Sequence, residues 1–348
     1  MTEKTNRKAE LLSSPVEHFD ITQFDARPVI DAWEKMSFTS RDAARAARIL
    51  GAAVADPDCS VILTLAGSTS AGGCMHVWRD MVRNNMVDAI VATGASIVDM
   101  DFFEAIGFKH YQARDIPDDR ILRDLYIDRI YDTYIDEEEL QACDHILGDI
   151  ADSLDPKPIS SRAFIHAMGK YLAEGGAKKE SSLIQECYEH GVPIFVPAFA
   201  DCSAGFGLVK HQVERMKEGK PYLSIDAVAD FRELTDIKIK AGTTGLFMIG
   251  GGVPKNFAQD TVVCAEILGH EVPMHAYAVQ ITVADVRDGA CSSSTLKEAC
   301  SWGKVDVALE QMVFAEATTV APVIVSDVYH RGAWKTRKKR RFADMFED

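Results

Sequence analysis

Short apolar runs alternate along this chain with longer stretches whose apolar residues recur at helical spacing. Six runs, most of them rich in Val, Ile, Leu or Phe, are predicted to be strands: residues 60–65, 89–93, 193–197, 245–249, 276–281 and 312–315. The helical stretches cover residues 41–55, 73–84, 183–190, 225–233, 257–268 and 321–328. Such alternation is typical of a parallel sheet covered on both faces. The sequence therefore predicts an α/β fold, a doubly wound, Rossmann-like, mostly parallel sheet with helices on both faces.

The chain is predicted to form one large domain. Its 348 residues, 47% of them hydrophobic, can bury a large core. Residues 115–158 are polar and acidic and form an excursion from the sheet, in which the acidic run 136–139 opens a helix. Two further helices, 159–173 and 180–190, lead back to the third strand. We place an N-terminal extension at residues 1–15, the main domain at 16–330 and a basic C-terminal tail at 331–348.

Charge and composition limit the partners. With 38 basic and 53 acidic residues the formal net charge is −15, which disfavours nucleic acid and suits a cationic substrate, although solubility alone would also explain it. The basic run 335–341 is predicted to lie in a disordered, solvated end, with a contact to an acidic subunit or to RNA left open. No run of 18 apolar residues predicts a membrane span, and residues 1–8 lack a secretory signal. Eight cysteines without a Cys-x-x-Cys pair indicate reduced thiols in the cytoplasm rather than disulfides or zinc.

Turns of small residues follow several predicted strands. Gly67-Ser68-Thr69-Ser70-Ala71-Gly72-Gly73 follows the first and opens a helix, Thr93-Gly94-Ala95-Ser96 follows the second, and Gly250-Gly251-Gly252 follows the fourth. Backbone N–H groups at such turns can hold a pyrophosphate, although the first is not G-x-G-x-x-G and small residues can also serve close packing of helix on sheet. Two such turns on neighbouring strands favour a dinucleotide site at the carboxyl edge of the sheet.

Carboxylates occur near the same strand ends. Asp99 follows the second turn, Asp201 the third strand and Glu316 the last. They can accept hydrogen bonds from ribose hydroxyls or bind the ammonium groups of a polyamine, and each could instead be a helix cap.

Ser301-Trp302-Gly303-Lys304, behind Asp288 and Glu298, places one lysine beside an indole and two carboxylates. A lysine in such surroundings can lose its proton and attack a carbonyl or imine carbon. Trp302 can supply an apolar wall and a cation–π surface, and Glu298 and Asp288 can neutralise ammonium groups. The alternatives are a solvated loop lysine, or one that merely pairs with Glu298.

These motifs, with Pro197-Ala198-Phe199-Ala200-Asp201 and Asn85-Met86-Val87-Asp88, resemble those of the deoxyhypusine synthases in identity and order from about Val16 to about Val328. The resemblance implies an NAD-dependent homotetramer that oxidises spermidine, releases 1,3-diaminopropane, holds the butyl-imine on a lysine and passes it to a lysine of a translation factor. By position, Lys304 is that lysine, and Trp302 and Glu298 line the spermidine tunnel. The positions that correspond to NAD contacts are Gly67, Ser68, Thr69, Ser70, Ala71, Thr93, Gly94, Ala95, Asp99, Asp201, Gly251, Gly252, Val283, Ala284, Glu316 and Ala317.

Several residues depart from the family pattern. Asn256 stands where eukaryotic members have a histidine base, so this catalytic position carries an amide that cannot exchange a proton near neutral pH. Cys291 and Phe206 replace expected carboxylates, Val98 replaces the first of a pair near Asp99, and the N-terminal extension is short. His275, or a water held by Asn256, could take over the proton transfer. The chain is thus predicted to be a divergent, deoxyhypusine synthase-like member that acts on spermidine or a related polyamine. Its acceptor is a protein lysine or putrescine, as in a homospermidine synthase, and a non-catalytic NAD- or polyamine-binding tetramer is the third hypothesis.

Overall fold

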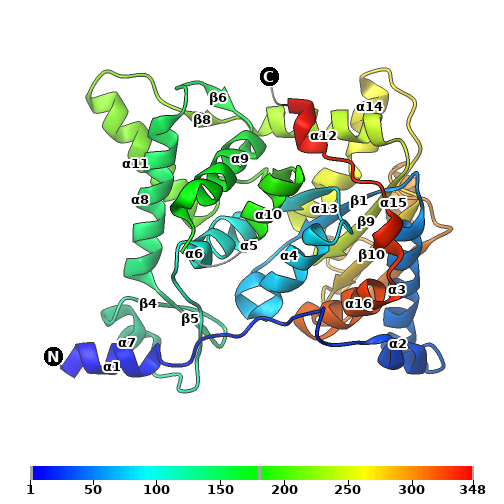
Figure 1. Ribbon diagram of the computed structural model, residues 1–348, viewed down its shortest axis with the longest axis horizontal. Coiled ribbons are helices and arrows are strands. Elements are labelled where there is room, and N and C mark those ends of the chain that lie inside the picture. The colour runs from blue at the N-terminus through cyan, green and yellow to red at the C-terminus, as the bar shows by residue number, and fades with distance from the viewer. Residues whose placement is uncertain (1–2, 179–181, 347–348) are drawn as a thin grey trace.

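The computed structural model describes residues 3–178 and 182–346, so the start of the helix predicted at 180–190 lies outside the described residues (Figure 1). The strands are β1 (Ser60–Leu65), β2 (Ala89–Ala92), β3 (Tyr111–Gln112), β4 (Ile127–Ile130), β5 (Thr133–Asp136), β6 (Pro158–Ile159), β7 (Ile194–Phe195), β8 (Ser224–Ile225), β9 (Thr244–Ile249), β10 (Tyr277–Thr282) and β11 (Glu310–Phe314). The helices are α1 (Glu3–Leu11), α2 (Arg27–Trp33), α3 (Phe38–Ala55), α4 (Met75–Arg83), α5 (Gly94–Ile97), α6 (Asp101–Ala105), α7 (Asp119–Asp124), α8 (Glu137–Ser153), α9 (Ser161–Tyr171), α10 (Leu183–His190), α11 (Ser203–Lys217), α12 (Ala227–Ala241), α13 (Gly252–Gln259), α14 (Thr261–Ile267), α15 (Leu296–Ser301) and α16 (Ala317–Arg331), with π turns at Ser70–Cys74 and Leu172–Gly176 and 3-10 turns at Ala333–Thr336 and Phe342–Phe346.

All six predicted strands form one parallel sheet in the order β11-β10-β9-β1-β2-β7. From β1 the chain adds β2 and then β7 on one side of the sheet. It then adds β9 on the other side of β1, followed by β10 and β11 further out. The order reverses between β1 and β9, and ligands of doubly wound sheets bind in the crevice at such a point. The predicted fold class is confirmed.

Both faces of the sheet are buried. Along β1, Val61 and Leu63 pack in the apolar cluster that contains α3 and α16, while Ile62 packs in a second cluster with α12, α13 and α15. Successive side chains of a strand point to opposite faces, so every residue of β1 is covered by helices. A near-continuous apolar run is what this position requires.

The long helix predicted at 257–268 is two helices that meet at Asp260. The backbone of Asp260 has ψ −8°, away from the helical value, and α13 ends and α14 begins around it. Within residues 115–158, β4 and β5 form an antiparallel sheet together with the preceding strand β3, and α7 and α8 flank this sheet. The predicted helix start at 136 is confirmed, because the Asp136 carboxylate accepts from the first amides of α8.

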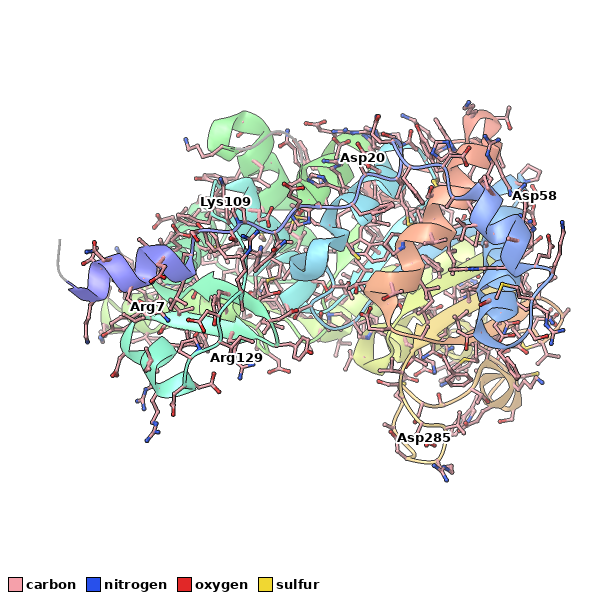
Figure 2. All side chains as sticks on the ribbon, turned by 90° about the horizontal axis from the view of Figure 1, so that it is seen from below. Arg7, Asp20, Asp58, Lys109, Arg129 and Asp285 are labelled. Atoms are coloured by element: carbon pink, nitrogen blue, oxygen red, sulfur yellow. The ribbon has the colours of Figure 1, made fainter. Side chains whose placement is uncertain are left out.

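Helix α1 of the predicted N-terminal extension lies against this small sheet. Arg7 pairs with Asp115 at 2.5 Å, and Lys8 pairs with Asp136 and Glu138 at 2.8 Å each. Seen from below, Arg7 and Arg129 lie in one half of the molecule, while the loop that carries Asp285 projects from the lower side of the other half (Figure 2). Helix α1 of the N-terminal extension therefore packs with residues 115–158, and not along an edge of the six-stranded sheet.

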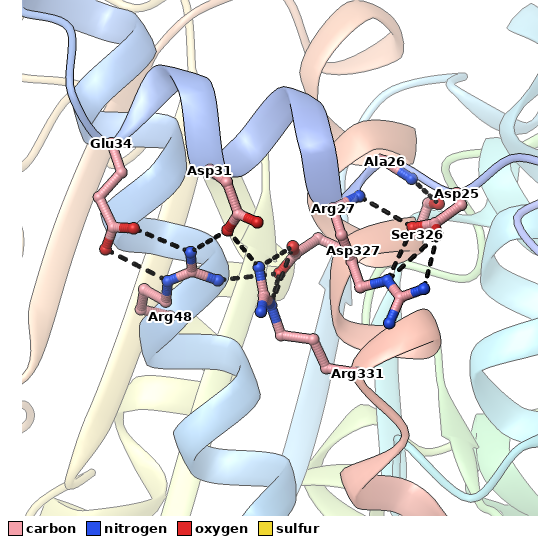
Figure 3. Close-up of polar contacts among 9 residues, drawn as sticks. All are labelled: Asp25, Ala26, Arg27, Asp31, Glu34, Arg48, Ser326, Asp327 and Arg331. Carbon is pink, nitrogen blue, oxygen red and sulfur yellow. Dashed lines mark hydrogen bonds and ion pairs between the residues drawn. The ribbon is translucent and has the colours of Figure 1, made fainter.

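A polar network ties the first helices of the main domain to its last (Figure 3). The Asp327 carboxylate on α16 is fully buried and accepts two hydrogen bonds from Arg331 at 3.0 Å. Arg331 also pairs with Asp31 of α2 at 2.7 Å, and Arg48 of α3 bridges Asp31 and Glu34. Charges that would be costly alone are thus held in a chain of opposite signs.

The prediction of a disordered, solvated C-terminal end is wrong for residues 331–346. The Arg337 guanidinium is buried, donates to both carboxylate oxygens of Asp88 and donates to the carbonyl oxygens of Cys59 and Asn85. Phe342 is buried in the second apolar cluster. In the sequence the basic run is a local group of charges. The residues that bury Arg337 and Phe342 lie far away along the chain, so the sequence pattern does not reveal them.

Candidate functional site

The loops after the six parallel strands meet at one edge of the sheet, as the parallel arrangement requires. At the reversal point, Gly67 follows β1 with φ +76° and Gly250 follows β9 with φ +69°. A Cβ on Gly250 would also lie 3.1 Å from the Cβ of Ala66, so backbone angle and close approach both require glycine there. The predicted small-residue turns are therefore neighbours across the crevice.

The turn after β1 borders a hollow of about 810 Å³. The carbonyl oxygen of Gly67 accepts from the hydroxyls of Thr93 and Ser96 at 3.1 and 2.6 Å, which joins the first two predicted turns. The hydroxyls of Thr69 and Ser70 are buried and have no hydrogen-bond partner among the described residues. The hollow is lined by Ser68, Thr69, Ala71 and Gly72 of the turn, by Glu316 just before α16 and Thr318 within it, and by nearby residues that include Arg114.

The carboxylates predicted near the strand ends have structural partners of their own. Asp99 is buried, and its two oxygens accept from the amides of Ser203 and Ala204 at 3.1 and 3.2 Å, at the start of α11. Burial raises the pKa of Asp99 against these hydrogen bonds. The predicted contact of Asp99 with ribose stays a prediction, and the structure gives the side chain a capping role.

The other predicted edge residues are more accessible. Glu316 caps α16 through the amides of Thr318 and Thr319, each at 3.0 Å, and still borders the hollow. Partial burial opposes ionisation of Glu316, but hydrogen bonds from these two threonines lower its pKa overall. Asp201 is exposed after β7, and Val283 after β10 is 76% exposed.

Lys304 lies in a second hollow of about 600 Å³, on the face formed by α13, α14 and α15. Helix α15 ends at Ser301, and Gly303 turns the chain with φ +72° so that Lys304 follows at once. The Lys304 carbonyl oxygen then accepts from the His275 amide at 2.9 Å, which anchors the backbone beside β10. The hollow is lined by Phe231, Asn256, Gln259, Asp260, Val263, Cys264, Ile267, Gly289, Ala290, Cys291, Ser294, Glu298, Ala299, Trp302 and Lys304.

The Lys304 ammonium has three partners there. Its Nζ lies 2.5 Å from Oδ1 of Asp260 and donates to Oδ1 of Asn256 at 3.2 Å. The Asn256 amide in turn donates to Oδ2 of Asp260 at 2.8 Å, and the Lys304 Nζ lies 5.2 Å from the centroid of the Trp302 ring. Lys304, Asn256 and Asp260 form a closed triangle, which we call the lysine triangle, and the Lys304 side chain is only 12% exposed.

Sequence reasoning missed Asp260; it expected Glu298 to bind the ammonium groups of a substrate and gave a pair of Lys304 with Glu298 only as an alternative. Glu298 lines the hollow but takes part in a capping box with Thr295 at the start of α15. A signal for Asp260 was present: it follows Asn256 by four residues, the spacing of helical neighbours. Asp288 accepts from the amide of Ala290 at 2.7 Å and from the Ser293 hydroxyl, so it shapes the loop before α15.

Lys255, next to Asn256, holds this loop in place. Its buried Nζ donates to the carbonyl oxygens of Cys291 and Ser294 at 2.9 and 2.5 Å and to the Ser294 hydroxyl at 3.0 Å. Burial lowers the pKa of Lys255 to about 8. Gly251 leaves no room for a side chain, because a Cβ would lie 2.4 Å from the Cα of Ser292. The hollow around Lys304 thus has a fixed wall.

Comparison with known proteins assigns the family. A sequence model described as deoxyhypusine synthase matches residues 28–328. The chain belongs to the deoxyhypusine synthase family. A deoxyhypusine synthase-like protein of Caulobacter vibrioides is 73% identical over 341 residues, which cover 98% of this chain and 93% of that protein. A protein of the same name from Coxiella burnetii is 69% identical over 340 residues, covering 98% and 96%.

More distant family members match over nearly the whole chain as well. "Probable deoxyhypusine synthase 2" of Methanosarcina mazei is 36% identical over 335 residues, which cover 96% of this chain and 94% of that protein. The crystal structure of a candidate deoxyhypusine synthase from Entamoeba histolytica has a TM-score of 0.59 at 19% identity and covers 94% of this chain and 99% of that one, so the fold is shared.

The structure also places the residues that depart from the deoxyhypusine synthase pattern. His275, considered as a substitute base, is fully buried and hydrogen-bonds Thr244 at 2.7 Å and the Ala258 carbonyl at 3.2 Å; burial lowers its pKa well below the usual value. It has no access to the hollow, so it cannot be that base. Cys291 borders the hollow, Val98 is buried, and Phe206 is 69% exposed on α11.

Two further features bear on partners and metals. Of residues 3–178 and 182–346, none belongs to a helix with the length and apolarity needed to cross a membrane. Within the same ranges, no group of three or more His, Cys, Asp or Glu side chains could hold a metal ion. All eight cysteines are free thiols.

Proposed function

We propose that this member of the deoxyhypusine synthase family is an NAD-dependent transferase. In this proposal it moves the aminobutyl group of spermidine, or of a related polyamine, to an acceptor amine through an imine on Lys304. The observation that carries the proposal is the placement of the Lys304 amine in a hollow beside a tryptophan ring and carboxylates. A primary amine in that setting can attack an imine carbon, and the walls of the hollow limit access of water to the product.

The same hollow supplies groups for a polyamine. The Trp302 indole offers a face for an alkyl ammonium, and Glu298 and Asp260 both place a carboxylate in the lining of the hollow. The acidic balance of the whole chain, formally −15, would concentrate a polycation near the site. In the proposal these groups bind a polyamine along its length and place one of its carbons, next to a nitrogen, beside the Lys304 amine.

The hollow beside the turn after β1 fits NAD. The buried hydroxyls of Thr69 and Ser70, which have no hydrogen-bond partner in the described part of the chain, suit a ligand rich in oxygen, and the backbone of the turn and the adjacent Glu316 suit phosphate and ribose. Ser68, Thr69, Ala71 and Glu316 would hold the cofactor there, with the Gly251-Gly252 turn across the crevice. When bound, NAD supplies the hydride acceptor for oxidation of the amine.

We further propose a homotetramer with sites near subunit boundaries, working in the cytoplasm. Among the described residues the two hollows have no lining residue in common, and a neighbouring subunit at such a boundary would add walls to both. Trp302 and Val283 are 66% and 76% exposed at the candidate site, an exposure of apolar surface that assembly would reduce.

The test is to incubate the purified protein with NAD and spermidine and to measure NADH and released 1,3-diaminopropane. Parallel samples contain no acceptor, putrescine, or the translation factor that carries the modified lysine in this family. Aminobutylated factor supports a protein acceptor, and homospermidine supports putrescine. If the protein binds NAD but no sample releases 1,3-diaminopropane, the proposed transferase activity is refuted, and a non-catalytic NAD-binding protein is the remaining hypothesis.

A further inference from the structure

We infer that Asp260 is the catalytic acid and base of Lys304 and that Asn256 is a positioning residue that holds the Asp260 carboxylate. For the polyamine reaction this inference rests on the proposed function. The part of the inference that concerns imine formation at Lys304 can be tested without NAD or a polyamine.

The fold brings Asp260 to the lysine through the break between α13 and α14. Asp260 is the N-terminal cap residue of α14, yet its side chain makes no capping hydrogen bond. The carboxylate instead points to Lys304 at 2.5 Å. An aspartate at a helix start ordinarily accepts from the first amides of the helix, as Asp136 and Asp226 do in this chain. The carboxylate of Asp260 is thus used for the lysine rather than for the helix.

Other candidate proton carriers around Lys304 are occupied. Glu298 closes its capping box, and the buried Lys255 ammonium already donates to three oxygens. In the described part of the chain, Asp260 is the one carboxylate that forms an ion pair with Lys304. Its side chain is 29% exposed and borders the hollow, so it can meet both the lysine and a ligand.

Asn256 uses both ends of its amide in the lysine triangle. Its carbonyl oxygen accepts from Lys304 while its NH2 group donates to Oδ2 of Asp260, so Oδ1 stays turned toward the lysine. A neutral amide provides this donor and acceptor pair without taking a proton itself. Asparagine at this position therefore fits a site whose proton carrier lies four residues further along the helix.

The chemistry balances as follows. The Asp260 carboxylate takes a proton from the Lys304 ammonium, and the lone pair of the resulting amine attacks the carbon of an imine protonated on nitrogen. A bond forms between Nζ and that carbon, and the carbon–nitrogen double bond becomes single. Asp260 gives its proton to the original nitrogen and takes one of the two protons left on Nζ, so that the lone pair of Nζ can form the new carbon–nitrogen double bond. The original nitrogen leaves as an amine with the electron pair of the broken bond, the protonated imine remains on Lys304, and the leaving amine takes up the proton held by Asp260.

With an aldehyde in place of the imine, the same transfers release water. The test therefore treats the protein with butanal and cyanoborohydride in the absence of NAD and spermidine, and peptide mapping measures the rate of butylation at Lys304. The variants are Asp260→Asn, which keeps the shape and removes the proton acceptor, and Asn256→Ala. Glu266→Gln is the matched control, because Glu266 is exposed on the same helix α14 and does not line the hollow.

We expect Asp260→Asn to slow butylation of Lys304 at neutral pH by about 10²–10⁴-fold, the range typical of a lost general acid–base group. The deficit should shrink as the pH rises, since hydroxide then removes the proton. Asn256→Ala should give a smaller loss with the pH profile of the parent, and Glu266→Gln no change. A structural role for Asp260 would alter the unfolding temperature but not this pH profile.

Equal butylation rates in the parent and Asp260→Asn across pH, with both proteins folded by circular dichroism, would overturn the inference. Failure of the proposed function looks different: the butanal result stands, but spermidine and NAD give neither NADH nor 1,3-diaminopropane. If the Asn256→Ala profile matches that of Asp260→Asn, the positioning role of Asn256 is wrong.

Discussion

Replacing Arg337 by Met should destabilise the protein strongly, although the side chain belongs to a run that looks like a solvated tail. Arg337 and Asp88 are each 1% exposed, and the pair is hydrogen-bonded on both sides. Without the guanidinium, the Asp88 carboxylate keeps, among residues 3–178 and 182–346, only the hydrogen bond from the Val61 amide at 2.7 Å, and the carbonyl oxygens of Cys59 and Asn85 each lose a donor. Leaving one buried charge without its partner costs about 3–5 kcal/mol.

That loss can be converted into a temperature. At about 2.1 cal/mol/K per residue, the unfolding entropy of a chain of 348 residues is about 0.7 kcal/mol/K. Dividing the lost free energy by this entropy predicts that the midpoint temperature of thermal unfolding falls by about 4–7 °C. The assay is thermal unfolding followed by circular dichroism at one fixed protein concentration, because assembly would otherwise shift the midpoint. Lys339→Met, an exposed cation of the same run, is the control.

The double variant Asp88→Asn/Arg337→Met removes both charges and should recover part of the loss. If Arg337→Met shifts the midpoint no more than Lys339→Met does, the pair carries no net stability and the argument from burial fails.

Further predictions concern the site and its surroundings. Lys304→Arg keeps the charge but cannot form the imine, so aminobutyl transfer should fall by several orders of magnitude while NAD binding, measured by equilibrium dialysis, persists; near-normal transfer would refute the lysine mechanism. Asn256→His should retain NADH formation from spermidine and add a pH dependence near the ordinary histidine pKa of about 6.5, seen in single-turnover absorbance; an inactive variant of a fast parent would contradict this. Burial raises the pKa of Asp144 from 3.8 to about 7, so the folded protein loses stability as the pH rises through this range. Asp144→Asn should therefore raise the unfolding midpoint relative to the parent at pH 8 and lose that advantage at pH 4, and an equal effect at both values would exclude the titration as its cause. Gly251→Ala should cost about 1–3 kcal/mol in urea unfolding, because the new Cβ meets the Ser292 backbone, and an unchanged midpoint would show that the loop yields.

The sheet could be predicted from sequence because buried parallel strands are short apolar runs with little ambiguity. Strand β1 has the predicted bounds, and all six strands were found. The break at Asp260 could not be predicted, since apolar spacing continues across it and only the backbone angle reveals two helices. The lysine was found from its neighbours in the chain. Its partner Asp260 lies 44 positions away, and although the spacing of Asp260 from Asn256 is a sequence signal, its pairing with Lys304 depends on the fold.

The C-terminal tail shows the same limit. A run of arginines and lysines predicts solvation because sequence patterns weigh each charge against its local neighbours. The carboxylate that neutralises Arg337 belongs to Asp88, 249 positions earlier and directly before β2. Ion pairs between residues so far apart in sequence depend on the order in which the strands assemble into the sheet, and the spacing of residues along the chain does not give that order.

The packing of α3 has a consequence for how the chain is synthesised. This helix is made early, yet the strands against which it packs include β10 and β11, which leave the ribosome about 250 residues later. At about 5–20 residues per second, the apolar face of α3 waits for tens of seconds without its final partner. That face is built largely from alanines, among them Ala43, Ala44, Ala46, Ala47 and Ala53, which expose less apolar area than leucines or isoleucines would. The small side chains that let α3 lie close to the finished sheet thus also lower the tendency of a growing chain to aggregate before the sheet exists.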